Sequence, residues 1–159
     1  MRALTLTLAA LGAIMLPAAA RAQRLGDTIV NVSSRDEAMN AAIAKGRQTL
    51  PDFFAHFEKP APGESGFLIK YDLLPEPGKA EFIWAEVIAH SPGVTTARLV
   101  NTPGDPRFKL GEKVSVRDAD IIDWGYWKDG VMQGQYTTRA LLPALDPAEA
   151  DAIRKAYKW

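Results

Sequence analysis

The residues with the greatest capacity for chemistry lie in one stretch near the C-terminus, DIIDWGYWKDGVMQGQYTTR, residues 120–139. It holds two tryptophans, two tyrosines and two glutamines around an Asp129-Gly130 pair. An Asp-Gly pair favours a two-residue hairpin turn, because such a turn needs positive φ at both positions. We therefore predict a hairpin in which Lys128 pairs with Val131.

That register predicts a hairpin face that is both aromatic and rich in amides. Trp124 and Tyr126 face Gln135 and Gln133, and Arg139 continues the same face. Aromatic planes flanked by amides suit a sugar, a peptide or another planar polar ligand, so these residues are candidate ligand-binding residues. In the alternative interpretation the two aromatic rings pack under a helix and the glutamines lie at the rim.

Carboxylates are the side chains best suited to acid–base chemistry. Glu86 shares a predicted strand face with Trp84, and a neighbouring indole would desolvate the carboxyl group and raise its pKa. Asp123 would supply the second member of a hydrolytic pair. In the alternative interpretation Glu86 forms a structural ion pair with Arg139. Trp84 and Glu86 join the ligand-binding candidates, and Glu86 with Asp123 form the alternative catalytic pair.

Asp123 also falls on the hairpin face opposite Trp124, among residues that we expect in the core. A buried carboxylate needs hydrogen-bond partners, which the Tyr136 hydroxyl or a backbone turn amide would supply. The other polar groups indicate little chemistry. The two histidines lie in no recognisable motif, and the nearby aspartates lack the glycine and the distal glutamate of a calcium loop. We expect no metal and no cofactor.

The N-terminus predicts export. Arg2 precedes an apolar run over residues 3–15, which is shorter than the about 20 residues that span a bilayer, and Ala20-Arg21-Ala22 fits a signal-peptidase site. We expect cleavage between Ala22 and Gln23, a signal peptide over residues 1–22 and one periplasmic or secreted domain over residues 23–159. With no cysteine in the chain, lipid attachment to a cysteine and a disulfide are both excluded.

The rest of the chain predicts one α+β domain. Residues 34–57 have helical periodicity that Pro51 breaks. Residues 67–73, 81–89, 94–101 and 113–117 alternate like strands, with 81–89 apolar on both faces and therefore expected to be covered on both. Residues 146–158 form a short closing helix. We predict an N-terminal helix, kinked at Pro51, on a strongly bent antiparallel meander of five or six strands.

Three stretches carry a resemblance to a known family: FIWAEV (residues 82–87), KLGEKVSV (residues 109–116) and the 120–139 hairpin. Together they resemble the YegJ-like bacterial domain of unknown function, family 2314, over about residues 35–142. The resemblance implies a fold and no reaction. It implies these signature residues: Trp84, Glu86, Asp123, Trp124, Gly134, Tyr136, Thr137 and Arg139.

The sequence as a whole favours a non-enzymatic periplasmic binding or protein-interaction module. A hydrolase-like enzyme acting on an envelope polymer is one alternative, and an inhibitor or immunity-type protein that docks by an exposed strand edge is another. The expected partner is an envelope glycan, a peptide or a protein. The mature chain has 17 basic and 19 acidic residues after Arg2 and Arg21 are removed, so nucleic acid is not expected as a partner.

Overall fold

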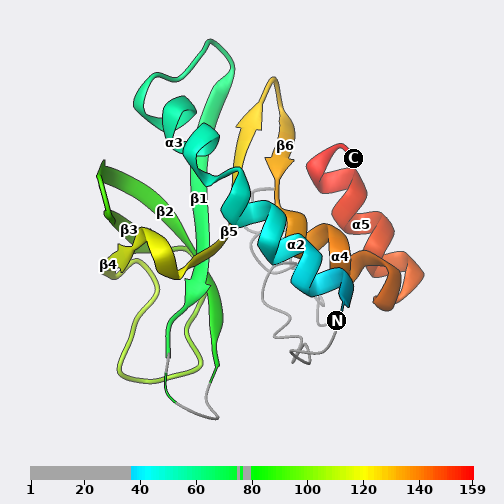
Figure 1. The fold of residues 1–159 in the computed structure, drawn as a ribbon. Coiled ribbons are helices and arrows are strands. Elements are labelled where there is room, and N and C mark those ends of the chain that lie inside the picture. The colour runs from blue at the N-terminus through cyan, green and yellow to red at the C-terminus, as the bar shows by residue number, and fades with distance from the viewer. Residues whose placement is uncertain (1–36, 75, 77–79) are drawn as a thin grey trace, which may run out of the picture.

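The computed structural model describes residues 37–74, 76 and 80–159 (Figure 1). The predicted signal peptide, its cleavage site and positions 34–36 of the predicted helix lie outside this part. The described part contains four α-helices and two short 3₁₀ turns: α2 Glu37–Gln48, α3 Leu50–Glu58, η2 Asp118–Asp120, α4 Tyr136–Leu141, η3 Leu142–Ala144 and α5 Pro147–Tyr157. None of these helices is long and apolar enough to cross a membrane.

Six antiparallel strands form one open sheet, which confirms the α+β class: β1 Glu64–Asp72, β2 Phe82–Ser91, β3 Val94–Leu99, β4 Lys113–Arg117, β5 Ile121–Lys128 and β6 Val131–Gly134. The strand order is β4-β3-β2-β1-β5-β6. The predicted meander is therefore correct for β1 to β4 and wrong for β5, which pairs with β1 instead of β4. The 3₁₀ turn η2 carries the chain from one edge of the bent sheet to the other side of β1.

The predicted break at Pro51 is confirmed. Helix α2 ends at Gln48, α3 begins at Leu50, and Thr49 between them leaves helical geometry with φ −100° and ψ 5°. A proline in the first turn of α3 costs no hydrogen bond, because the amides there have no intrahelical acceptor. The Thr49 hydroxyl donates to the Lys45 carbonyl oxygen at 2.8 Å, which closes the last turn of α2.

One face of the sheet, the inner face, holds the core. Phe53 of α3 is fully buried against it, and its ring lies 5.4 Å from Trp124 of β5 in a stacked arrangement. Ile69 of β1 and Ala85 of β2 are also fully buried on this face. The phenylalanines of α3 thus cover the centre of the inner face. Burial of the apolar side chains between α3 and the sheet is the main contribution to the stability of the domain.

The opposite face, the outer face, is covered unevenly. Helices α4 and α5 lie on the β5–β6 side of the molecule (Figure 1). On β2, Glu86 and Ile88 are exposed. Trp84, which lies nearer the start of the strand, is only 9% exposed. The expectation that residues 81–89 are covered on both faces is therefore wrong for the second half of the strand. Ile88 follows the buried Val87, so alternation puts it on the outer face, and the pairing with β3 has a bulge at this point.

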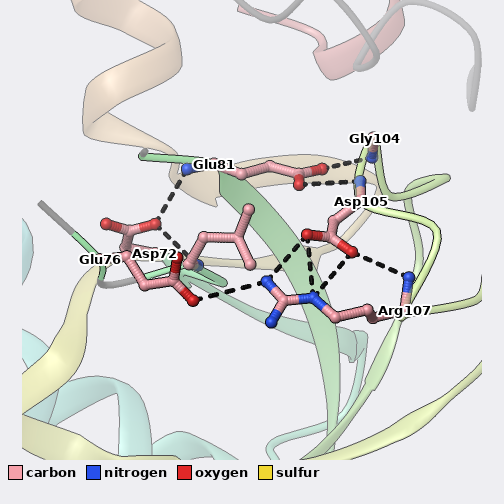
Figure 2. A network of polar contacts seen from close by, with 7 residues as sticks. Asp72, Glu76, Glu81, Gly104, Asp105 and Arg107 are labelled. Atoms are coloured by element: carbon pink, nitrogen blue, oxygen red, sulfur yellow. Dashed lines mark hydrogen bonds and ion pairs between the residues drawn. The ribbon is translucent and has the colours of Figure 1, made fainter. Parts of the chain in front are cut away.

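A polar network fixes the C-terminal end of β1 and the N-terminal end of β2 (Figure 2). Glu81 precedes β2 and is buried, and its carboxylate accepts hydrogen bonds from the Gly104 amide at 2.6 Å and the Asp105 amide at 3.3 Å. Arg107 closes the network through Asp105 at 2.9 Å. The loop between β3 and β4 is thereby tied to the start of β2.

Candidate functional site

The predicted hairpin register is confirmed for the paired part of β5 and β6. Lys128 pairs with Val131, Tyr126 with Gln133, and Gly125 with Gly134. Asp129 and Gly130 both take positive φ, 50° and 74°, as the two-residue turn requires. The alternation of side chains therefore puts Tyr126 and Trp124 on the inner face of the sheet.

The inner face is the core, so the expected aromatic platform is not an exposed surface. Trp124 and Tyr126 are each 6% exposed, and the Trp124 ring nitrogen donates to the Gly46 carbonyl oxygen at 3.1 Å. Phe53 packs against both rings. The alternative interpretation is therefore correct for the two rings, which pack under a helix. It is wrong for Gln135, which is buried and does not lie at the rim. Neither ring is available to a ligand.

The three polar candidates of the hairpin form hydrogen bonds within β6 and at the start of α4. Gln135 is 1% exposed and accepts a hydrogen bond from the Thr138 hydroxyl at 2.6 Å. Gln133 donates to the Val131 carbonyl oxygen at 3.2 Å. Arg139 donates to the carbonyl oxygens of Gly134 at 2.9 Å and Met132 at 3.2 Å. The suggested ion pair between Arg139 and Glu86 is therefore wrong.

The predicted strand does not continue to Arg139, because the chain turns into a helix. Gly134 and Gln135 both have positive φ, 68° and 55°, and α4 begins at Tyr136. No side chain of the adjoining residues caps this helix. The cap comes from Asp123 on β5, which accepts hydrogen bonds from the Tyr136 amide at 3.1 Å and the Thr137 amide at 2.7 Å.

Asp123 is fully buried, and its hydrogen-bonding capacity is taken up inside the protein. Besides the two α4 amides, it accepts from the Trp124 amide at 2.8 Å and the Thr137 hydroxyl at 2.6 Å. Of the two partners suggested for it, the backbone amide is correct and the Tyr136 hydroxyl is not. Burial raises the pKa of the Asp123 carboxyl, and the hydrogen bonds from Thr137 and Trp124 oppose that shift. Four donors on one carboxylate are typical of a structural group.

Lys70 completes this buried cluster and was not among the sequence candidates. It pairs with Trp84 on one neighbouring strand and with Asp123 on the other. Its ammonium group donates to the Thr137 hydroxyl at 3.2 Å and lies 5.5 Å from the centre of the Trp84 ring. Burial lowers the pKa of Lys70, and the Asp123 carboxylate opposes the shift. The signal in the sequence is a lysine flanked by the apolar residues Ile69 and Tyr71 in the middle of a predicted strand.

Glu86 lies on the same outer face as Lys70 and Asp123, but it is exposed and separated from Asp123 by strand β1. Directly opposite it on β3 is Arg98, which is also exposed. In the alternative catalytic pair, Glu86 is therefore exposed, whereas Asp123 is buried and already accepts four hydrogen bonds. Asp123 has no free lone pair with which to hold a substrate or a water molecule.

The histidines have partners within the fold. The His90 ring stacks on Phe54 at 3.6 Å between ring centres, with the Glu58 carboxylate at 3.1 Å from one nitrogen and the Asp118 carboxylate at 3.0 Å from the other. His56 contacts Glu64 at 3.0 Å. In the described part of the chain, no group of three or more histidine, cysteine or acidic side chains is arranged to hold a metal ion.

Residues 36–158 of the chain match the model of a family described as "Uncharacterized protein conserved in bacteria (DUF2314)". The chain belongs to this family. The match extends beyond the 120–139 hairpin to α5, so the family model includes every helix and strand described above. No curated protein and no solved structure matches the chain.

Proposed function

We propose that the protein is a non-enzymatic binding module that acts after export and docks an acidic protein partner. The proposed docking surface is the outer face of strands β2–β4. The observation that carries the proposal is the exposure of apolar side chains on that face beside a group of cations. Ile88 is 39% exposed and Val94 is 41% exposed.

The apolar residues of this surface are unusual for their position. Large apolar side chains of the described residues are otherwise mostly buried, and those that are exposed number four. Two of the four, Ile88 and Val94, lie on adjoining strands β2 and β3, at the end where Ser91 pairs with Val94. Exposed apolar groups that lie together on one surface and are rimmed by charges are typical of a protein-interaction site.

The charge of the surface selects the partner. Arg98 on β3 pairs with Lys113 on β4, and both side chains are exposed. Arg117 follows on the same strand but is paired with Asp120 at 2.7 Å and 2.8 Å. This leaves Arg98 and Lys113 against Glu86, the acidic group that faces Arg98. Cations therefore outnumber anions on this face, which favours an acidic partner and would accelerate its association at low salt.

The two alternatives are less well supported by the geometry. A hydrolase using Glu86 and Asp123 would need a second accessible carboxylate, and Asp123 is 0% exposed. An inhibitor that docks by a strand edge would need an apolar edge. The β6 edge is covered by Arg139 and by Trp159, whose ring nitrogen donates to the Met132 carbonyl oxygen at 2.8 Å. The β4 edge, KVSVR, is short and charged, which discourages strand pairing.

Site-specific photocrosslinking in the cells that carry the gene tests the proposal. A photoreactive residue at Ile88 is expected to give a discrete adduct with an acidic protein. The same residue at Leu110, which is 56% exposed in the loop before β4, is the matched control and is expected to give none. Equal adducts at both positions, or no adduct at Ile88, would contradict the proposal.

A charge exchange tests the choice of partner. Arg98→Glu and Lys113→Glu are each expected to slow association with the crosslinked partner several-fold at low salt, and less at high salt, because exposed charges are screened beyond roughly 10 Å at 0.1 M. Lys155→Glu on the exposed side of α5 is the control and is expected to change association little. Equal effects of all three variants would show that net charge, and not this surface, governs the encounter.

A further inference from the structure

We propose a second site, independent of the docking surface, that binds a free α-amino acid with an apolar side chain. It is a cavity of ≈ 390 Å³ between helix α2 and the ends of strands β1, β2 and β5. The residues that define its chemistry are Ile43, Arg47, Asp72, Phe82, Asp120 and Ile122.

The size of the cavity limits the ligand. Small-molecule pockets have volumes of about 300–1,000 Å³, and a cavity of ≈ 390 Å³ is near the lower end of that range. It has room for one amino acid or a very short peptide, which matches the size of the proposed ligand.

Arg47 on α2 provides the cationic side of the cavity. Its Nε atom donates to the Ile121 carbonyl oxygen at 3.4 Å, which anchors the guanidinium group at the start of β5. Among the described residues this is its one hydrogen bond, so its terminal amino groups are available to a ligand. A guanidinium group binds a carboxylate through two parallel hydrogen bonds, which makes it suited to the carboxylate of an amino acid.

Asp72 at the end of β1 provides the anionic side. Its Oδ1 atom accepts hydrogen bonds from the Leu74 amide at 3.0 Å and the Glu81 amide at 2.9 Å, so the carboxylate is held in a fixed orientation (Figure 2). Both hydrogen bonds fall on one oxygen, which leaves Oδ2 for a ligand ammonium group. Asp120, the other acid of the cavity, is already paired with Arg117 at 2.7 Å and 2.8 Å.

Phe82 provides the apolar wall. Its side chain is 44% exposed although it lies in the sheet beside the buried Ile83, and with Ile43 and Ile122 it lines the cavity. An apolar ligand side chain placed there would cover Phe82 and gain about 25 cal/mol for each Å² of apolar surface removed from water. A guanidinium, a carboxylate and an apolar wall in one small cavity match the three parts of an apolar α-amino acid.

Calorimetric titration of the protein with L-leucine and L-phenylalanine tests the site. At least one of the two is expected to bind. Its N-acetyl derivative, which lacks the ammonium group, and its carboxamide, which lacks the carboxylate, are each expected to bind about ten-fold more weakly, because each loses one charge-assisted contact.

Two variants assign the contacts. Arg47→Gln is expected to weaken the amino acid about ten-fold and to abolish its advantage over the carboxamide. Asp72→Asn keeps the Oδ1 acceptor for the two amides and is expected to abolish the advantage over the N-acetyl form. Arg154→Gln, which removes an exposed arginine of α5, is the control and is expected to bind like the unchanged protein.

A third variant guards against misfolding of the Asp72 variant. Ile43→Trp fills the cavity from α2 and leaves the Asp72 carboxylate itself unchanged. It is expected to abolish binding while the thermal unfolding curve stays cooperative. Absence of binding by both amino acids would overturn the proposal, and so would affinities that none of these variants changes. Neither outcome bears on crosslinking at Ile88, so this site and the proposed docking surface fail separately.

Discussion

The junction between β5 and α4 and the outer face of β2–β4 differ in how their polar groups are used. At the junction, Asp123 is fully buried and every hydrogen bond that it accepts comes from the protein itself. On the outer face, Glu86 of β2 pairs with Arg98 of the neighbouring strand β3, and both side chains are exposed. Both regions carry residues of the sequence motifs that resemble the family, yet only the second offers groups to another molecule.

The contrast separates the structural and the functional interpretation of a polar motif. A carboxylate whose lone pairs are filled by backbone amides fixes the chain, because moving it would leave those amides unsatisfied in the interior. A carboxylate at the surface contributes little to the free energy of unfolding, so replacing it has little effect on stability. Its role depends on the molecule that binds there. The stability effects of substitution should therefore differ sharply between the two regions.

The largest expected effect is at the junction. Asp123→Ala leaves the amides of Trp124, Tyr136 and Thr137 without an acceptor and the Lys70 ammonium group without its counter-charge. The free energy of unfolding is expected to fall by about 3–5 kcal/mol, the usual result of breaking a buried charged network. Urea denaturation followed by tryptophan fluorescence measures it.

Asp123→Asn is the matched control, because it keeps one acceptor oxygen in the same place. It is expected to lose clearly less stability than Asp123→Ala, since a carbonyl oxygen still caps α4. A loss below about 1 kcal/mol for Asp123→Ala would contradict the assignment, because it would equal the effect of an ordinary surface cap.

The second effect tests how closely α2 lies on β5. A Cβ atom on Gly46 would lie 2.5 Å from the Ile122 carbonyl oxygen and 3.1 Å from the Asp123 Cα atom. Gly46→Ala is expected to destabilise the protein by about 1–3 kcal/mol through overpacking, although the same change in an open helix gains about 1 kcal/mol. Thermal unfolding is the measurement.

Ala44→Gly is the control for helix propensity, because Ala44 is exposed on the same helix. It is expected to cost about 0.5–1 kcal/mol. If Gly46→Ala raised the unfolding temperature, α2 would not make the close contact with β5 that positions the Asp123 cluster.

Local patterns in the sequence are sufficient for most of the fold. The Pro51 break, the Asp146 cap of α5, β4 at Lys113–Arg117 and the Asp129-Gly130 register all follow from residues within a few positions of one another. The position of β5 beside β1 does not follow from neighbouring residues, because local sequence does not determine which edge of a sheet a strand joins. The helix α4 was missed for the same reason, since its cap is Asp123, a residue of another element.

The site was harder to predict than the fold because burial is a property of the whole molecule. Trp124 and Tyr126 alternate correctly, but which face of a hairpin becomes core depends on where α3 packs. Lys70 and Arg47 belong to no motif. Each is placed in its site by a hydrogen bond to a residue far away in the sequence, Lys70 to Thr137 and Arg47 to Ile121. Strand alternation predicts that Glu86 shares a face with Trp84, but it does not predict that Glu86 is exposed.

A smaller effect is expected at Tyr71, which lies on β1 beside Lys70. Its hydroxyl is the buried side-chain polar atom that lacks a hydrogen-bond partner in the described part of the chain. Tyr71→Phe removes this unsatisfied group and is expected to raise the free energy of unfolding by about 1 kcal/mol at neutral pH.

The same variant has a signature at alkaline pH. Burial, with contributions from Glu112 and Glu81, raises the pKa of Tyr71 to about 12, whereas a tyrosine in the unfolded chain ionises near about 10. The unfolded state therefore releases a proton first, and stability falls as the pH rises from about 10 to about 12. Tyr71→Phe is expected to lack this component of the loss; parallel pH profiles for both proteins would show that Tyr71 ionises normally in the fold.

The smallest effect on stability is expected on the outer face, and it completes the contrast with the junction. Glu86→Lys should change the free energy of unfolding by no more than about 0.5 kcal/mol, because the side chain is exposed. The same change removes an anion that faces Arg98, so it should speed association with an acidic partner several-fold at low salt. Chemical denaturation and stopped-flow binding measure the two quantities on one variant. A large loss of stability would place Glu86 in the structural class with Asp123, while an unchanged association rate would separate Glu86 from the docking surface.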